Sequence, residues 1–147
     1  MLLDANVLLY AVDARSPQNA AASRWLDSAL NGDRRVGLPW QTIGAFLRIA
    51  THPRVTTQPL TSDGALGFVR SWLDADPVWI PPATERTAAV LARLSTTTPV
   101  TGNLVPDAQL AALAIEHGLT VMSSDTDFAR FPEVRWHDPL RGGSAGG

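Results

Sequence analysis

Short apolar runs alternate along the chain with longer segments in which apolar side chains recur every three or four positions. The short runs predict buried strands and the longer segments predict helices with one apolar side. Because strands that alternate with helices usually pair in parallel, the pattern predicts a three-layer α/β/α sandwich around a short, mainly parallel sheet. Strands are expected at residues 1–3, 36–38, 78–80, 120–122 and 134–137, and helices at about residues 18–30, 40–50, 62–74, 84–94 and 106–116.

The helix expected at residues 106–116 is apolar almost all round, which predicts that it is buried. Pro106 suits the first position of a helix, and Gly118 suits the position just beyond its end. In open α/β sheets of this kind, ligands bind beyond the carboxyl ends of the strands. The residues that follow the strands are therefore the first candidates for chemistry.

The composition is that of one folded domain. The chain has 147 residues, of which 45% are apolar and 18% charged, so a single domain is expected over residues 1–140, with a flexible Gly-rich tail at residues 141–147. The absence of cysteine excludes disulfides and thiolate metal sites. A start unlike a leader peptide and the lack of a long apolar run predict a cytoplasmic protein with no membrane partner. A net charge of −2 confines nucleic-acid binding to a local patch.

Three carboxylates occupy positions at which ligands gather in such a sheet. Asp4 follows the first strand, Asp125 follows the fourth, and Asp107 lies in the first turn of the buried helix. Each stands beside apolar sequence, where a lone ionised carboxylate is costly to desolvate. Brought together they would repel one another unless a cation neutralised them, and oxygen ligands without Cys suit Mg²⁺ or Mn²⁺.

Each acid also has a purely structural explanation. Asp4 could form a turn with Asn6 at the strand end, and Asp107 is favoured in a first helical turn by the helix dipole. Asp125 could cap a short segment over residues 126–130. Taken singly, the structural and functional interpretations are about equally good, and it is the joint arrangement that favours a metal site.

Several motifs carry a resemblance to a known family. Residues 2–9 resemble the opening strand and turn of PIN domains, residues 103–114 resemble their third motif, and residues 121–128 resemble the fourth. Residues 40–55 and 130–140 look like a branch of VapC-type toxins. The resemblance covers nearly the whole chain, and the motifs are specific in combination.

This resemblance implies a Mg²⁺-dependent endoribonuclease, with Mn²⁺ as a substitute, that blocks translation by cleaving RNA and is inhibited by a VapB-like antitoxin. DNA is not an expected substrate. The resemblance assigns the metal and catalytic roles to Asp4, Asp107 and Asp125. It gives Asn6 the task of orienting Asp4 or a metal-bound water, and gives Ser124 a similar supporting part.

One position departs from the family pattern. Most members carry a Glu on the second helix, at the position that Ala45 occupies here, and residues 40–50 contain no acid. Glu116 lies roughly 13 Å along its helix from Asp107, too far to join the site. Asp127 is the nearest replacement and is expected to support the metal or its waters; a solvated loop residue is an equally good explanation of it.

Basic residues at the end of the second helix are candidates for RNA contacts. Arg48, His52 and Arg54 lie at or just beyond that end. Cations are favourable there in any case, and guanidinium groups also form paired hydrogen bonds with phosphate. The resemblance to the VapC branch, which keeps this string of residues, favours the second role, and we therefore expect them to bind RNA phosphates.

Two other function classes compete with the nuclease. Phosphatases and receiver domains with an Asp at a strand end rely on a lysine, whereas all 12 basic residues of this chain are Arg. The phosphatase would also need a second Asp at the position of Asn6. The alternative that remains is a degenerate PIN domain that binds RNA or a protein partner without cleavage, because Ala45 replaces the usual Glu.

Apolar side chains on the first and third predicted helices indicate an interface, because they amount to more apolar surface than a thin sandwich covers. A homodimer is therefore expected, together with a groove that takes an antitoxin tail. The side chains concerned are Trp25, Leu66, Phe68, Val69 and Trp72.

Overall fold

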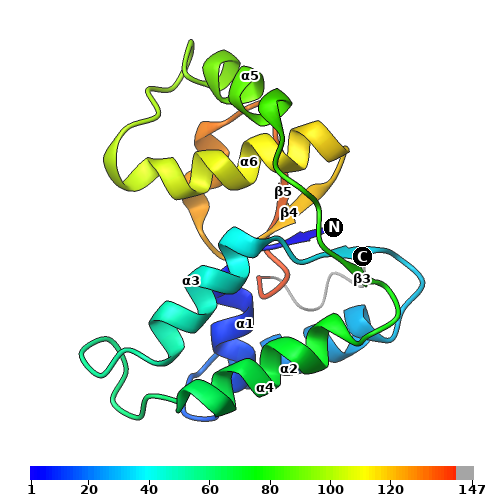
Figure 1. Cartoon of the computed structure of the whole chain (residues 1–147), viewed down its shortest axis with the longest axis vertical. Helices are drawn as coiled ribbons and strands as arrows, with labels where there is room; N and C mark the ends of the chain where they lie inside the picture. Colours follow the sequence, from blue (N-terminus) through cyan, green and yellow to red (C-terminus); the bar gives the residue numbers. More distant parts are fainter. Residues whose placement is uncertain (142–147) are drawn as a thin grey trace.

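The computed structural model describes residues 1–141 (Figure 1), so the predicted tail lies outside the described residues apart from Arg141. The strands are β1 (Leu2–Leu3), β2 (Val36–Gly37), β3 (Val78–Trp79), β4 (Thr120–Met122) and β5 (Arg135–His137). The helices are α1 (Ala5–Val12), α2 (Asn19–Leu30), α3 (Trp40–Ala50), α4 (Ser62–Leu73), α5 (Glu85–Leu94) and α6 (Val105–His117), with 3₁₀ turns η1 (Gly102–Leu104) and η2 (Thr126–Arg130). None of these helices combines the length and hydropathy of a membrane-spanning segment.

The strands form one sheet in the order β3-β2-β1-β4-β5, and every pairing is parallel. The predicted sandwich with a short parallel sheet is confirmed, and β5 lies at an edge as expected. The chain runs outward from β1 to β3 and then crosses back to place β4 on the other side of β1. Right-handed crossovers in opposite directions put their helices on opposite faces, and Figure 1 shows α1 to α4 on one side of the strands and α5 with α6 on the other.

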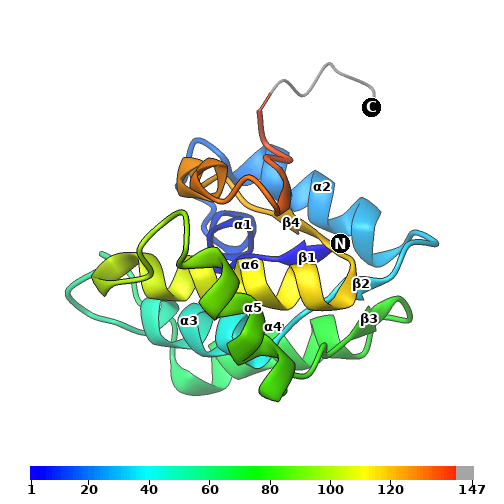
Figure 2. The same cartoon turned by 90° about the horizontal axis from the view of Figure 1, so that it is seen from above.

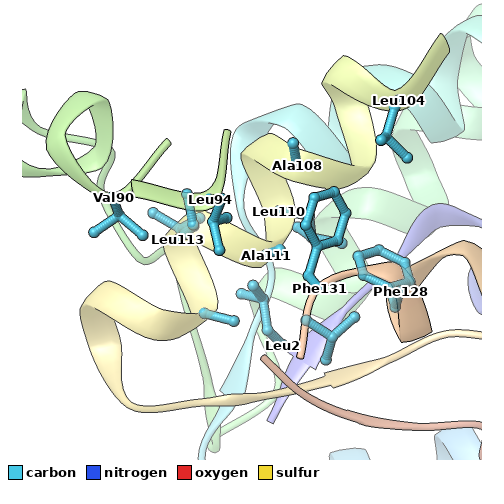
Figure 3. Close-up of a cluster of buried hydrophobic side chains, with 13 residues drawn as sticks. Leu2, Val90, Leu94, Leu104, Ala108, Leu110, Ala111, Leu113, Phe128 and Phe131 are labelled. Atoms are coloured by element: carbon cyan, nitrogen blue, oxygen red, sulfur yellow. The ribbon is translucent and has the colours of Figure 1, made fainter. Parts of the chain in front are cut away.

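Successive residues of the central strands point to opposite faces of the sheet and enter two separate cores. Leu2 and Val121 pack with α5, α6 and the rings of Phe128 and Phe131 (Figure 3). The next residues along, Leu3 and Met122, pack with α1 to α4. Both faces of the sheet are thus covered by helices, which leaves the strand ends as the place where polar side chains gather.

Helix α6 is buried, as its apolar sequence predicts. The side chains with little exposure run almost continuously from Ala108 to Ala114. Pro106 lies in the first turn, and Gly118 ends the helix with a φ of +66°, a conformation that favours glycine. Seen from above, β1 and β4 lie between α6 and α2 (Figure 2). The later turns of α6 pack on the central strands, and its first turn lies near Asp4, the residue that follows β1.

Helix α1 is the main element that the sequence pattern does not predict, because it indicates only a strand and a turn at this point. Residues 5–12 are almost entirely apolar and lack the polar face by which an amphipathic helix is recognised. Tertiary packing decides the structure instead: Ala5, Val7 and Leu8 are all buried. Asp4 begins the helix as its N-cap, so the turn expected after β1 continues as a helix.

The apolar surface predicted on α4 is smaller than expected. Val69 and Trp72 are buried, and the indole of Trp72 packs edge-to-face on Phe46 with ring centroids 4.9 Å apart. Leu66 and Phe68 remain 42% and 38% exposed. The expected exposure of Val69 and Trp72 is therefore wrong, because α4 turns these two residues towards α3.

Candidate metal centre

The carboxylates named by the sequence lie where the direction of the chain across the sheet reverses. That point is between β1 and β4, and ligands in open α/β sheets bind there, beyond the carboxyl ends of the strands. Asp4 follows β1 directly, Asp125 follows β4 after two serines, and Asp107 enters from the first turn of α6. The topology thus brings together acids that are far apart in the chain.

The Asp4 carboxylate is held by hydrogen bonds to both of its oxygens. Oδ1 accepts from the backbone N–H of Ala5 at 2.8 Å. Oδ2 accepts from the hydroxyl of Ser123 at 2.6 Å and from the amide of Asn6 at 3.3 Å. Asn6 therefore orients Asp4 directly, as one of the two tasks proposed for it requires.

Ser123 links the ends of the two central strands. It has 0% exposure, and its hydroxyl donates to Asp4 while accepting from Asn6 Nδ2 and from the backbone N–H of Asp125, each at 3.0 Å. Ser124, to which the family resemblance gives a supporting part, donates its backbone N–H to Asn6 Oδ1 at 3.2 Å. The serine hydroxyl that bonds to Asp4 is thus that of Ser123. The sequence feature that could have indicated it is a serine directly after a buried strand, where a hydroxyl needs a hydrogen-bond partner.

Asp107, Asp125 and Asp127 form a group of acids that could hold a metal ion. One carboxylate oxygen from each lies within 4.8 Å of the other two. Asp125 caps η2, its Oδ1 accepting from the backbone N–H of Asp127 at 2.9 Å. The capping role considered for Asp125 thus exists alongside its place in the cluster, and the cap is what brings Asp127 to the group.

The electrostatic cost of this arrangement is visible in two pKa values. Burial, followed by the charges of Asp125, Asp4 and Asp127, raises the pKa of Asp107 to about 7. Burial also raises the pKa of Asp4, against the opposing effect of its hydrogen bonds from Ser123 and Ala5. Both carboxylates resist ionisation, so a nearby positive charge would stabilise their ionised forms.

A small cavity of about 60 Å³ opens between α3 and the acids. Asp4 and Asp107 line it from one side, and Gln41, Thr42 and Ala45 line it from α3. The Thr42 hydroxyl donates to the carbonyl oxygen of Leu3 at 2.7 Å, which joins α3 to β1. Ala45, at the position where the family pattern has a Glu, therefore lines the cavity with the acids but presents only a methyl group.

The carboxylates in and beside this cavity fit a divalent ion that prefers oxygen ligands. The four carboxylates at this edge of the sheet supply such ligands, which Mg²⁺ and Mn²⁺ favour. The ion pairs among residues 1–141 join other acids, namely Asp13, Glu133 and Asp138. The negative charge of the cluster is thus not balanced by an arginine ion pair within the described residues.

Glu116 lies away from these acids, as the helix geometry predicts. Its carboxylate accepts from the hydroxyls of Thr84 and Thr87 at 2.5 and 2.6 Å, and these bonds lower its pKa. Thr84 and Thr87 also form the capping box of α5. Glu116 therefore joins α6 to the start of α5.

The three predicted phosphate-binding residues lie at the opposite end of α3 from Gln41. Arg48 and Arg54 are exposed, and His52 is half-buried. The backbone N–H of Arg54 donates to His52 Nδ1 at 3.0 Å, which leaves Nε2 of the imidazole to carry the proton in the neutral form. Helix α3 thus connects the acidic cavity at one end with basic side chains at the other.

Sequence comparisons place the chain among known proteins. A family model described as "PIN domain" matches residues 1–134. Ribonuclease VapC37 of Mycobacterium tuberculosis is 45% identical, over 94% of this chain and 96% of the relative. Ribonuclease VapC33 of the same organism is 41% identical over the same shares of both chains.

Solved structures share the fold at low sequence identity. VapBC2 from Rickettsia felis, bound to a DNA fragment from its promoter, superposes with a TM-score of 0.66 at 14% identity, over 92% of this chain and 96% of the other. VapBC-1 from nontypeable Haemophilus influenzae also gives a TM-score of 0.66, at 17% identity, over 95% and 98% of the two chains. These similarities identify the arrangement of strands and helices.

Proposed function

The chain belongs to the PIN-domain family, and we propose that it is a divalent-metal-dependent endoribonuclease, the toxin of a VapBC-type pair that blocks translation by cleaving RNA. The observation that carries this proposal is the group of Asp107, Asp125 and Asp127, with oxygens within 4.8 Å of one another, beside the cavity that Asp4 lines. Relatives named ribonucleases support RNA as the substrate, and DNA is not an expected substrate.

In this proposal Asp4, Asp107 and Asp125 hold the metal, and Asp127 supports the ion or its waters. A bound Mg²⁺, or Mn²⁺ in its place, would activate water for attack on the phosphodiester and stabilise the charge that develops there. Asp107, with its pKa of about 7, must lose its proton to bind a cation. The hydrogen bonds that Asp4 accepts from Ser123 and Asn6 fix the direction of its carboxylate.

Arg48, His52 and Arg54 would bind the RNA backbone at the end of α3 that lies away from the acidic cavity. Replacing both arginines by Ala is expected to weaken RNA binding for every sequence and to make binding less dependent on salt, by about one unit of the log–log slope for each phosphate that the protein no longer neutralises. Fluorescence anisotropy with a labelled RNA at several salt concentrations measures this. The matched control replaces Arg24 and Arg70, two exposed arginines on α2 and α4, by Ala. An unchanged slope in the variant that lacks Arg48 and Arg54 would contradict the assignment.

The partners proposed are a VapB-like antitoxin and a second copy of the chain. The VapBC assemblies among the structures with this fold support the antitoxin. The exposed Leu66 and Phe68 on α4 support the homodimer, and light scattering that finds a monomer at high concentration would contradict it. We also propose that residues 1–140 act as a single domain in the cytoplasm.

The proposed function is tested by removing metal from the purified protein and measuring its cleavage of an RNA before and after a metal ion is added. We expect no cleavage until Mg²⁺ or Mn²⁺ is added, and loss of cleavage when a chelator is added in excess. Denaturing gels of an end-labelled RNA show the products, and a DNA of the same sequence serves as the control. Absence of RNA cleavage with both ions would contradict the nuclease and favour a binding domain.

A further inference from the structure

Helix α3 lines the cavity of Asp4 and Asp107 with three residues, Gln41, Thr42 and Ala45. Gln41 and Ala45 are four residues apart, so their side chains lie on the same face of the helix. Ala45 ends in a methyl group and offers no ligand atom. The hydroxyl of Thr42, the third α3 residue there, already donates to β1. Gln41 is therefore the α3 side chain in the cavity with a polar group to offer.

The amide of Gln41 has no partner among the hydrogen bonds of the described residues. The side chain is half-buried. A polar group that is partly withdrawn from water is stabilised when it gains a hydrogen-bond partner or an ion to coordinate. Its carbonyl oxygen is a hard, neutral donor of the kind that divalent ions accept beside carboxylates. Gln109 also lines the cavity, but its side chain is exposed. It lies two positions after Asp107 on α6, and side chains two positions apart on a helix point in different directions.

The charge of the centre favours a neutral ligand at this position. Asp4, Asp107, Asp125 and Asp127 carry up to four negative charges, and their repulsion already acts on Asp107. A fifth carboxylate from α3 would bind an ion more strongly but would add repulsion when the ion is absent. The amide oxygen of Gln41 adds a ligand without adding charge.

We propose that Gln41 binds the divalent ion through its amide oxygen and supplies, as a neutral ligand, the contribution of α3 that Ala45 cannot make. This inference rests on the proposed function, because it takes the acidic cluster to be a metal centre. It implies that the ion is held more loosely than it would be with a carboxylate on α3. A phosphate oxygen of the substrate would then complete the coordination of the ion and strengthen its binding.

The experiment measures Mn²⁺ affinity directly, by titrating metal-free protein without RNA and following free Mn²⁺ by electron paramagnetic resonance. Gln41→Ala is expected to weaken binding by about 10-fold, and Gln41→Glu to tighten it by about 10-fold because of the added ligand charge. Gln109→Ala controls for loss of an amide at the rim. Gln58→Glu, at an exposed position before α4, controls for the change in net charge. Circular dichroism checks that each variant is folded.

The outcomes separate this inference from the proposed function. If wild type binds Mn²⁺ and Asp107→Asn does not, the metal centre stands; Gln41→Ala binding as tightly as wild type would then overturn the role of Gln41 alone. Tighter binding by Gln41→Glu without weaker binding by Gln41→Ala would overturn it too, because the amide would then not be a ligand. A wild type that binds no Mn²⁺ would overturn both the inference and the metal centre on which it rests.

Discussion

Asp4→Asn is expected to lower metal-dependent RNA cleavage by about 1,000-fold or more, a loss typical of removing a central catalytic group, while the protein stays folded. The substitution keeps the shape of the side chain but removes the negative charge through which Asp4 would hold a cation. Asn is also a good N-cap, so its oxygen can still accept from the N–H of Ala5 at the start of α1. Initial rates of RNA cleavage at saturating Mg²⁺, with a thermal melt of each protein, measure both expectations.

The matched control is Asp27→Asn, which removes the same charge from an exposed position on α2 and is expected to cleave at the wild-type rate. Cleavage by Asp4→Asn at the wild-type rate would show that the acidic cluster does not perform the reaction, or that a contaminating nuclease does. A large loss of melting temperature in Asp4→Asn would instead show that the carboxylate is needed for the fold, through its bonds to Ser123 and Asn6.

The three central acids could be inferred from the sequence because a simple geometric rule places them. Asp4 and Asp125 follow apolar runs that are typical of parallel strands, and the carboxyl ends of neighbouring parallel strands meet at one edge of a sheet. Asp107 could be placed because Pro106 marks the beginning of a helix, and that helix is too apolar to lie on the surface. These inferences needed only local pattern and a topological rule.

The features that could not be predicted depend on contacts between distant segments. Ser123 donates to an acid 119 positions away. Its place directly after a buried strand shows that its hydroxyl needs a partner, but that partner can be named only when β1 and β4 are paired. Helix α1 lacks a polar face, so its conformation follows from burial of Ala5, Val7 and Leu8 and not from periodicity. The place of Gln41 beside the acids likewise needed the packing of α3 on β1, which the bond from Thr42 to Leu3 secures.

The melting temperature of the metal-free protein is expected to fall as the pH rises from about 5 to 8. In the folded chain the pKa of Asp107 is raised to about 7 from its ordinary value of 3.8, so between these values the folded state binds more protons than the unfolded state. Stability therefore decreases with pH across that window and the loss is complete above about pH 7. The raised pKa of Asp4 acts in the same direction.

Because Asp107 is only half-buried, solvent screening reduces its effect, and we expect a fall of about 2–4 °C, the shift that ~1 kcal/mol produces in a domain of this size. Asp107→Asn cannot ionise at position 107 and is expected to flatten most of this profile, which separates the contribution of Asp107 from that of the other ionisable groups. Added Mn²⁺ is expected to raise the melting temperature more at pH 8 than at pH 5.5, because at the lower pH it must displace a proton from Asp107. A wild-type profile that rises with pH while that of Asp107→Asn stays parallel to it would contradict this account, since it would mean that burial of Asp107 and repulsion from the neighbouring acids do not raise its pKa.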